Sequence, residues 1–163
     1  MSQYDDLIFN SAATNGLPYD WRLWKAQIKQ ESQFNPLAMS PVGALGLAQF
    51  MPKTWKEWAP KAGYPDADPT DPEASVNTGA AYMKSLWSQW KSPRPDIDRI
   101  CLSMASYNAG LGSILKAQKL ANNANDYKTI IAQLRNVTGD KNAFETTTYV
   151  KRILGYYNDE VTG

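Results

Sequence analysis

Hydrophobic positions recur along most of the chain roughly three to four residues apart, the spacing of α-helices. In segment 20–32, for example, Leu23, Trp24 and Ile28 share one face, and the Asn35-Pro36 pair ends the pattern. We expect helices at 2–14, 20–32, 73–90, 97–109, 114–121, 127–136 and 144–158, a short helical turn at 47–51, and a helix that starts at Pro52 and carries Trp55 and Trp58. No repeat or long linker divides these segments. The prediction is therefore one predominantly α-helical (all-α) domain over residues 1–163, with little or no β-structure.

Composition narrows the chemistry that this domain can perform. The 163 residues carry a net charge of +1, which gives no electrostatic reason to expect a nucleic-acid partner. The sequence contains no histidine, so Ser-His and Cys-His nucleophilic machinery and histidine-bound zinc are excluded. The single cysteine, Cys101, lies in an apolar stretch and is interpreted as a buried structural thiol. Acid–base chemistry must fall to a carboxylate, a lysine or a tyrosine.

Two acidic residues are spaced as in a metal-binding loop, but the residues that follow them do not suit such a loop. Asp66 and Asp68 are spaced as in a calcium loop, but Pro69 and Asp71 stand where such a loop needs glycine and flexibility. Asp71 followed by Pro72 is instead typical of a helix N-terminus. We expect no metal and no cofactor.

Glu31 is the strongest candidate for acid–base work. No other Asp or Glu lies between it and Glu57, and Ile28 and Phe34 are its apolar neighbours. We expect these surroundings to desolvate the carboxyl group and raise its pKa, so that it donates a proton near neutral pH. A solvated glutamate at a helix end is the alternative that this local pattern alone favours.

Four motifs, in order along the chain, favour the catalytic role of Glu31 over that of a solvated glutamate. They are Glu31-Ser32, the run from Gly46 to Pro52 (Gly-Leu-Ala-Gln-Phe-Met-Pro), Tyr107-Asn108-Ala109-Gly110, and Glu145-Thr146-x-x-Tyr149-Val150. Together they resemble the soluble lytic transglycosylase family, over about residues 17 to 158. The resemblance implies a lysozyme-like fold and an enzyme that cleaves the glycan strands of peptidoglycan.

The resemblance also implies roles for individual residues. Glu31 would be the sole catalytic acid and base at the β-1,4 bond between N-acetylmuramic acid and N-acetylglucosamine, and the product would carry a 1,6-anhydromuramic end. A single carboxylate suffices because the muramic O6 hydroxyl replaces water, whereas hydrolases ordinarily use two carboxylates. The residues that the resemblance places at the substrate are Ser40, Gln49, Met51, Tyr107, Asn108, Glu145 and Tyr149. Each of these seven has a core or supporting role as its alternative.

Tryptophans offer apolar surfaces on which sugar rings can stack. Trp55, Trp58, Trp87 and Trp90 are therefore candidates for a sugar-binding cleft, but their helical spacing equally suits the core. We expect most of them to be core residues.

Other functions remain open at this stage. A goose-type lysozyme or another hydrolase would use the same fold with water as the nucleophile, and a wall-binding or virion module would keep the fold without activity. The acidic N-terminus lacks the features of a signal peptide, and no segment has the length and apolar character of a membrane span. We therefore expect a bacteriophage endolysin or virion-associated lysin, a monomer held in the host cytoplasm until release to the cell wall or carried in the virion. Its partner would be peptidoglycan, with no nucleic acid and no membrane insertion.

Overall fold

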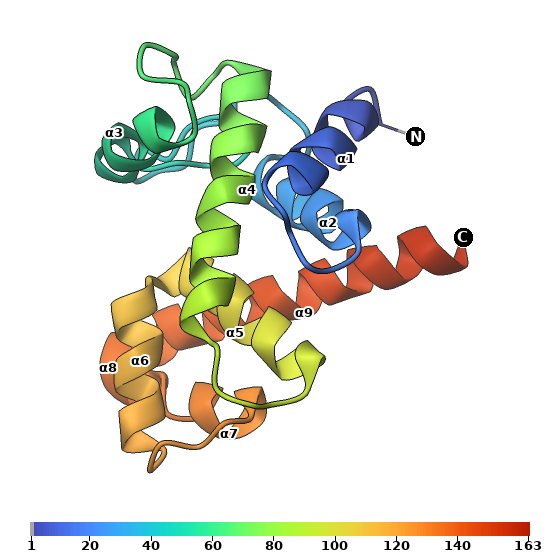
Figure 1. Cartoon of the computed structure of the whole chain (residues 1–163). Coiled ribbons are helices and arrows are strands. Elements are labelled where there is room, and N and C mark those ends of the chain that lie inside the picture. The colour runs from blue at the N-terminus through green and yellow to red at the C-terminus, as the bar shows by residue number, and fades with distance from the viewer. Residues whose placement is uncertain (1) are drawn as a thin grey trace. The chain divides into compact units, whose positions relative to one another are not determined.

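A computed structural model describes residues 2–163 and shows a helical protein (Figure 1). Over these residues there is no strand, and only isolated β-bridges join Leu45 to Met39 and to Phe50. The all-α prediction is thus confirmed. The helices are α1 (Asp5–Thr14), α2 (Trp21–Ser32), α3 (Pro52–Lys61), α4 (Pro72–Gln89), α5 (Asp96–Ala109), α6 (Leu111–Leu120), α7 (Tyr127–Ile131), α8 (Arg135–Thr138) and α9 (Asp140–Thr162).

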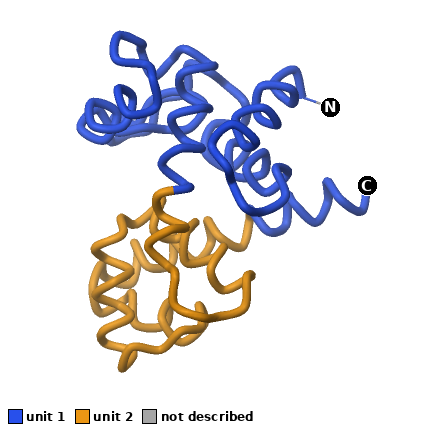
Figure 2. Tube along the Cα trace, in the orientation of Figure 1, with its two compact units in different colours: residues 1–84, 153–163 blue, residues 85–152 orange. Residues whose placement is uncertain are grey.

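The chain forms two compact units, shown in different colours in Figure 2. Unit 1 comprises residues 1–84 and 153–163, and unit 2 comprises residues 85–152. Helices α4 and α9 each begin in one unit and end in the other. That residues 1–163 form one domain stays a prediction.

The starts of three predicted helices are present, and each has an identifiable local cause. Asp20 caps α2, because its carboxylate accepts a hydrogen bond from the backbone N–H of Arg22 at 3.0 Å. Asp71 caps α4 in the same way, with the backbone N–H of Ala74 as donor at 3.0 Å. Pro52 opens α3, where its missing N–H costs no helical bond.

Two predicted helical segments differ in the structure. Residues 47–51 form no helical turn, because the backbones of Leu45 and Phe50 exchange two hydrogen bonds of 3.0 Å and Gln49 adopts a left-handed φ of 54°. The segment 127–136 is interrupted between α7 and α8. There the backbone bonds close over three residues, as from Gln133 to Ile130 at 3.0 Å, which tightens the turn and ends the α-helical pattern.

Helix α2 runs through the core of unit 1. The fully buried indole of Trp24 donates to Ser11 of α1 at 3.2 Å, and the Gln27 amide donates to the sulfur of Met83 in α4 at 3.4 Å. Gly79 lets α4 approach this indole, since a Cβ there would lie 2.7 Å from a Trp24 ring carbon. The middle of α2 is therefore held by close packing against α1 and α4.

Unit 2 has its own apolar core around α5. Trp90 is buried and donates to Ser106 at 3.0 Å, and the guanidinium of Arg99 lies 4.2 Å from the ring centroid of Trp87. Cys101 is buried there as predicted, and burial, with the nearby charge of Asp98, raises the pKa of its thiol to about 12. Trp55, Trp87 and Trp90 are buried, whereas Trp58 is half-buried. The expectation that most of these tryptophans are core residues is confirmed.

Candidate functional site

Glu31 occupies the last turn of α2 and is half-buried. The backbone reverses immediately after it, because Gln33 and Phe34 both adopt left-handed conformations with φ of 51° and 60°. Residues other than glycine rarely adopt this backbone conformation, and two such residues in succession are strained. Such strain is concentrated at functional sites, which makes the end of α2 a candidate site on geometry as well as on sequence.

The loop of residues 33–51 follows, and Gln49 holds its shape. Both hydrogens of the Gln49 side-chain amide are used inside the loop, in 2.9 Å bonds to the carbonyl oxygens of Ala38 and Gly46. Since both partners can only accept, the nitrogen must face them and the oxygen Oε1 is left as the acceptor. Gly46 itself has a φ of 84°, and a Cβ at this position would overlap the carbonyl oxygen of Pro69. This part of the loop has one close-packed conformation that requires glycine.

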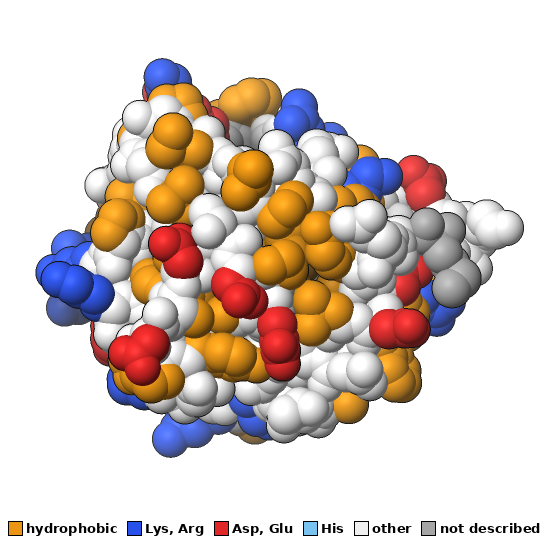
Figure 3. Space-filling view, turned by 90° about the horizontal axis from the view of Figure 1, so that it is seen from above, with side chains coloured by type: hydrophobic (Ala, Val, Ile, Leu, Met, Phe, Trp, Pro, Cys, Tyr) orange, Lys and Arg blue, Asp and Glu red, His pale blue; other side chains and the backbone are white. Residues whose placement is uncertain are grey.

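Ser40 and Met51 also belong to this loop. The hydroxyl oxygen of Ser40 accepts from the backbone N–H of Ala44 at 3.0 Å, so its own hydrogen can still be donated. Met51 precedes α3 and is 41% exposed. Apolar side chains are frequent at the surface in Figure 3, and acidic side chains lie among them. In the 33–51 loop the large exposed apolar residues are Leu37, Met39, Val42 and Met51.

The other predicted residues belong to unit 2. Tyr107 and Asn108 lie in the last turn of α5, which ends at Ala109 and is followed by Gly110 with a φ of 90°. Glu145 and Tyr149 lie four residues apart on α9; Glu145 is exposed, whereas Tyr149 is only 4% exposed. Asn108 and Glu145 line the same polar pocket. In unit 1 the predicted residues thus lie in or directly before the 33–51 loop, and in unit 2 the structure brings Asn108 and Glu145 to one pocket, which Tyr149 does not line.

Sequence reasoning missed three residues of this unit 2 pocket. Thr138, Asn142 and Thr146 line it together with Asn108 and Glu145. Part of their signal was present in the spacing, because Glu145 and Thr146 follow Asn142 by three and four positions, which places all three on one face of a helix. The fourth motif contains both Glu145 and Thr146, but only Glu145 was predicted to lie at the substrate.

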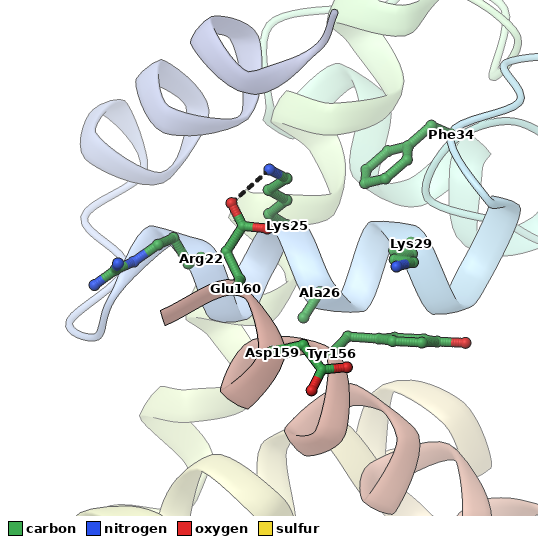
Figure 4. A pocket seen from close by; sticks show the side chains of 8 residues that line it. All are labelled: Arg22, Lys25, Ala26, Lys29, Phe34, Tyr156, Asp159 and Glu160. Atoms are coloured by element: carbon green, nitrogen blue, oxygen red, sulfur yellow. Dashed lines mark hydrogen bonds and ion pairs between the residues drawn. The ribbon is translucent and has the colours of Figure 1, made fainter. Parts of the chain in front are cut away.

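A second cavity, of about 130 Å³, lies between α2 and the C-terminal end of α9, both within unit 1 (Figure 4). Arg22, Lys25, Ala26 and Lys29 line it from one face of α2, and Phe34, Tyr156, Asp159 and Glu160 complete it. Glu31 comes nine positions after Arg22, which at about 100° per residue places it on the opposite side of the helix. None of the predicted site residues is among those lining the cavity.

The charges of this cavity are largely matched inside the protein. The ammonium of Lys25 is buried and pairs with Asp5 at 3.1 Å and Glu160 at 2.7 Å, while Arg22 pairs with Asp20 at 2.7 Å. Burial alone would lower the pKa of Lys25, but the hydrogen bonds to Glu160 and Asp5 outweigh it and raise that pKa. Lys29 lies 4.4 Å from the ring centroid of Tyr156. The contacts of Lys25 and Lys29 hold α9 against the face of α2 that lies opposite Glu31. These contacts therefore stabilise the helix that carries Glu31.

Two further findings bear on what the chain can bind. In the part of the chain that the structure describes, no group of three or more His, Cys, Asp and Glu side chains is placed to hold a metal ion. Among the helices of residues 2–163, none combines the length and apolarity needed to cross a bilayer.

The helical fold, with a glutamate at the end of a central helix and a strained loop after it, is that of lysozyme-like catalytic domains. The chain belongs to the transglycosylase SLT domain family, whose model matches residues 7–130. Glu31, the 33–51 loop and the Tyr107-Asn108 pair fall inside this match, whereas Glu145 and Tyr149 lie beyond it.

Individual relatives agree with this assignment. The chain is 32% identical over 160 residues to the membrane-bound lytic murein transglycosylase F of Yersinia enterocolitica, covering 89% of this chain and 32% of that protein. The corresponding protein of Maricaulis maris is 37% identical over 110 residues, which cover 68% of this chain and 23% of that protein. The chain thus spans about a third or less of the length of these relatives.

Solved structures give the same result. The 70-kDa soluble lytic transglycosylase of Escherichia coli superposes with a TM-score of 0.75 at 30% identity, covering 98% of this chain and 24% of that one. An inactive mutant of the lytic transglycosylase Slt of Pseudomonas aeruginosa gives a TM-score of 0.76 at 28% identity, with 98% and 24% covered. The predicted family is therefore confirmed.

Proposed function

We propose that this chain is a peptidoglycan lytic transglycosylase that cleaves the β-1,4 bond between N-acetylmuramic acid and N-acetylglucosamine. The observation that carries the proposal is the placement of Glu31 at the end of α2, directly before the left-handed pair Gln33 and Phe34, in a chain of the transglycosylase SLT family. The relatives named above are lytic transglycosylases, and a further similar structure is a complex of the 70-kDa soluble lytic transglycosylase with bulgecin A.

In the proposed reaction Glu31 acts twice. Its protonated carboxyl group gives a proton to the glycosidic oxygen as the bond from that oxygen to C1 of the muramic acid breaks. The resulting carboxylate then takes the proton of the muramic O6 hydroxyl as O6 bonds to C1. Glu31 is thereby returned to its protonated form, no water is consumed, and the product carries a 1,6-anhydro ring.

The remaining predicted residues would hold the substrate. Gln49 retains one acceptor oxygen and Ser40 one hydroxyl hydrogen, so this loop offers the substrate one acceptor and one donor. Met51, two positions after Gln49, offers an exposed apolar surface. Tyr107, Asn108, Glu145 and Tyr149 are proposed to contact or support the glycan strand from unit 2.

Mass spectrometry of the soluble products from purified peptidoglycan tests the reaction. We expect anhydromuropeptides from the wild-type chain and none from the Glu31→Gln variant. Reducing-end products from the wild type would instead identify a hydrolase of the goose-type lysozyme kind. No product from a folded wild-type chain would identify an inactive wall-binding or virion module.

The biological setting is a separate proposal. We propose that the chain acts as a bacteriophage lysin, either released from the host cytoplasm at lysis or carried in the virion, and that it works as a monomer. The support is the sequence interpretation alone. Proteomic analysis of purified virions and of lysates distinguishes the two routes, and light scattering at several protein concentrations measures the mass against 18.2 kDa for one chain.

A further inference from the structure

Helix α4 carries a buried hydroxyl group, that of Ser75, which contacts the 33–51 loop of unit 1. The Ser75 side chain is fully buried and lies in the first turns of the helix. Its backbone N–H donates to the carbonyl oxygen of Asp71 at 2.9 Å, and the Asp71 carboxylate caps the helix through the N–H of Ala74. The Ser75 hydroxyl is therefore attached to a well-fixed part of α4.

This hydroxyl meets the loop at the backbone of Ala48. The Ala48 N–H donates to Ser75 Oγ at 3.1 Å, and because an amide N–H can only donate, the serine oxygen is the acceptor. Both residues are 0% exposed, so water does not reach either partner. Because loss of the acceptor of a buried N–H costs free energy, the position of Ala48 depends on Ser75.

Two glycines let α4 and the loop approach each other at this bond. A Cβ at Gly46 would lie 3.3 Å from Ser75 Oγ, in addition to its overlap with the Pro69 carbonyl oxygen. A Cβ at Gly79, about one turn after Ser75, would lie 3.0 Å from Ala48 Cβ. The loop and the helix are therefore in close contact where the Ala48–Ser75 hydrogen bond forms.

Gln49 follows Ala48 directly and belongs to the same bend, residues 46–49. Its φ of 54° is left-handed, and the carbonyl oxygen of Gly46 accepts from its backbone N–H at 3.2 Å and from its side-chain amide at 2.9 Å. A strained conformation of this kind persists only where the surrounding structure holds it. Since the Ala48–Ser75 hydrogen bond connects the bend to α4, its loss should let the bend relax and move Gln49.

We propose that Ser75 is the positioning residue of Gln49: through Ala48 it fixes the bend of residues 46–49 and, with it, the place of Gln49 Oε1. The inference rests on the proposed function, in which this oxygen accepts a hydrogen bond from the glycan strand. Ser75 is buried, so its effect reaches the substrate through Gln49. Removing the Ser75 oxygen should displace Gln49 Oε1 and weaken substrate binding, while Glu31 and its proton transfers stay in place.

The position of Gln49 can be measured without substrate or turnover, by NMR of the full-length ¹⁵N-labelled chain. The Gln49 side-chain amide signals are assigned by their loss in Gln49→Met. We expect Ser75→Ala to shift these signals and to make their exchange with water at least threefold faster, because the bonds to Ala38 and Gly46 loosen. Unchanged signals in a folded Ser75→Ala chain would overturn the proposal.

Ser11→Ala is the matched control. Ser11 of α1 is also a buried serine of unit 1, only 1% exposed, and its oxygen accepts from the indole N–H of Trp24 at 3.2 Å. This variant therefore loses a similar hydrogen bond, but it should leave the Gln49 signals at their wild-type positions. Equal shifts in Ser11→Ala and Ser75→Ala would show a general loosening of unit 1 and exclude a positioning role.

An isosteric pair of variants isolates the oxygen of Ser75. Ser75→Thr and Ser75→Val add the same methyl group, but only threonine keeps the acceptor for the Ala48 N–H. We expect wild-type-like Gln49 signals in Ser75→Thr and displaced signals in Ser75→Val. Equal displacement in both would mean that the acceptor makes no difference and that the proposal is wrong. If the added methyl group unfolds both variants, the comparison of Ser75→Ala with Ser11→Ala decides alone.

Kinetics test whether the position of Gln49 matters to the substrate. On soluble, uncrosslinked peptidoglycan strands, Ser75→Ala should raise the KM for anhydromuropeptide release about three- to tenfold, the effect of one weakened hydrogen bond, and keep kcat within about twofold. Ser75→Thr and Ser11→Ala should keep the wild-type KM. A lower kcat at unchanged KM in Ser75→Ala would place the effect at Glu31 and contradict positioning through Gln49. If the wild-type chain forms no anhydromuropeptides, the proposed function fails, and the NMR comparison still decides whether Ser75 positions Gln49.

Discussion

Side-chain amides serve different purposes in the two units. In unit 1, Gln49 gives both of its amide hydrogens to backbone oxygens, and its main role is to hold the 33–51 loop in a strained conformation. In unit 2, Asn108 is exposed, with its Oδ1 at 2.8 Å from the hydroxyl of Thr146, and its side-chain amide remains available to a ligand. The comparison teaches that one functional group, the side-chain amide, can support a loop in one unit and remain available to a ligand in the other. The internal hydrogen bonds decide which.

The comparison predicts first that chemistry depends on unit 1. Glu31→Gln should reduce the rate of anhydromuropeptide formation by about 10³-fold or more, the range expected for loss of a general acid and base. Glu145→Gln is the matched change of an exposed carboxyl in unit 2, and should reduce the rate less than tenfold. Initial rates on purified peptidoglycan measure both. A larger loss in Glu145→Gln than in Glu31→Gln would reverse the assigned roles.

The second prediction concerns the rigidity of the 33–51 loop. Gly46→Ala should lower the free energy of unfolding by about 3 kcal/mol, because it combines a left-handed φ with overlap on the Pro69 carbonyl. Gly43→Ala is the control: φ is 96° at Gly43, but no atom lies within 4 Å of the added Cβ, and the loss should be about 1 kcal/mol. Urea denaturation measures both. Similar values would mean that the loop adjusts around Gly46.

The third prediction separates the two amides directly. Gln49→Met removes two hydrogen bonds from the loop and should cost about 1–2 kcal/mol of stability. Asn108→Leu changes an exposed side chain and should cost less than about 0.5 kcal/mol while it weakens ligand binding. Urea denaturation measures the stability of each variant, and cosedimentation with purified insoluble peptidoglycan in the Glu31→Gln background measures ligand binding. If Gln49→Met were as stable as the wild type, Gln49 would not be the residue that holds the loop.

The smallest effect expected is in the reactivity of Cys101. Its buried thiol has a pKa of about 12, so the neutral form dominates at pH 8 and alkylation should be slow until unit 2 opens. Raising the pH toward 12 increases the thiolate fraction and should accelerate labelling. Gly46→Ala should leave the labelling rate near that of wild type if unit 1 loosens on its own. Acceleration in proportion to the lost stability would support folding as one domain.

Helix periodicity predicted most of the fold, because each helix buries an apolar face whose residues recur three to four positions apart in the sequence. The local failures arose where hydrogen bonds outside the helical pattern prevailed, as in the paired backbones of Leu45 and Phe50. Burial of Cys101 and of most tryptophans was predictable from their apolar neighbours.

The candidate site was predictable only as far as its motifs. Glu31 and Gln49 could be named from short motifs. The hydrogen bonds from Gln49 to Ala38 and Gly46, however, depend on the left-handed backbone conformation of Gln49, which cannot be predicted from the residue type. The hydrogen bond of Thr146 was hidden for a different reason. Its partner Asn108 is 38 positions away in sequence, and such contacts are created by the fold. The prediction that Glu31 has a raised pKa awaits a pH–rate profile, in which we expect a group titrating above about 4.3.

The division of α9 between the two units has a consequence for how members of this family can diverge. Residues up to Arg152 belong to unit 2 and residues from Ile153 to unit 1, yet α9 is continuous from Asp140 to Thr162. Deleting one residue near this boundary would turn every later side chain by about 100° relative to every earlier one. The pairing of Glu160 with Lys25 and the pocket face at Glu145 could then not both be kept. Length changes should therefore be accepted in the loops and rejected in α9, and an exchange of unit 2 between relatives must preserve the helical phase at this junction.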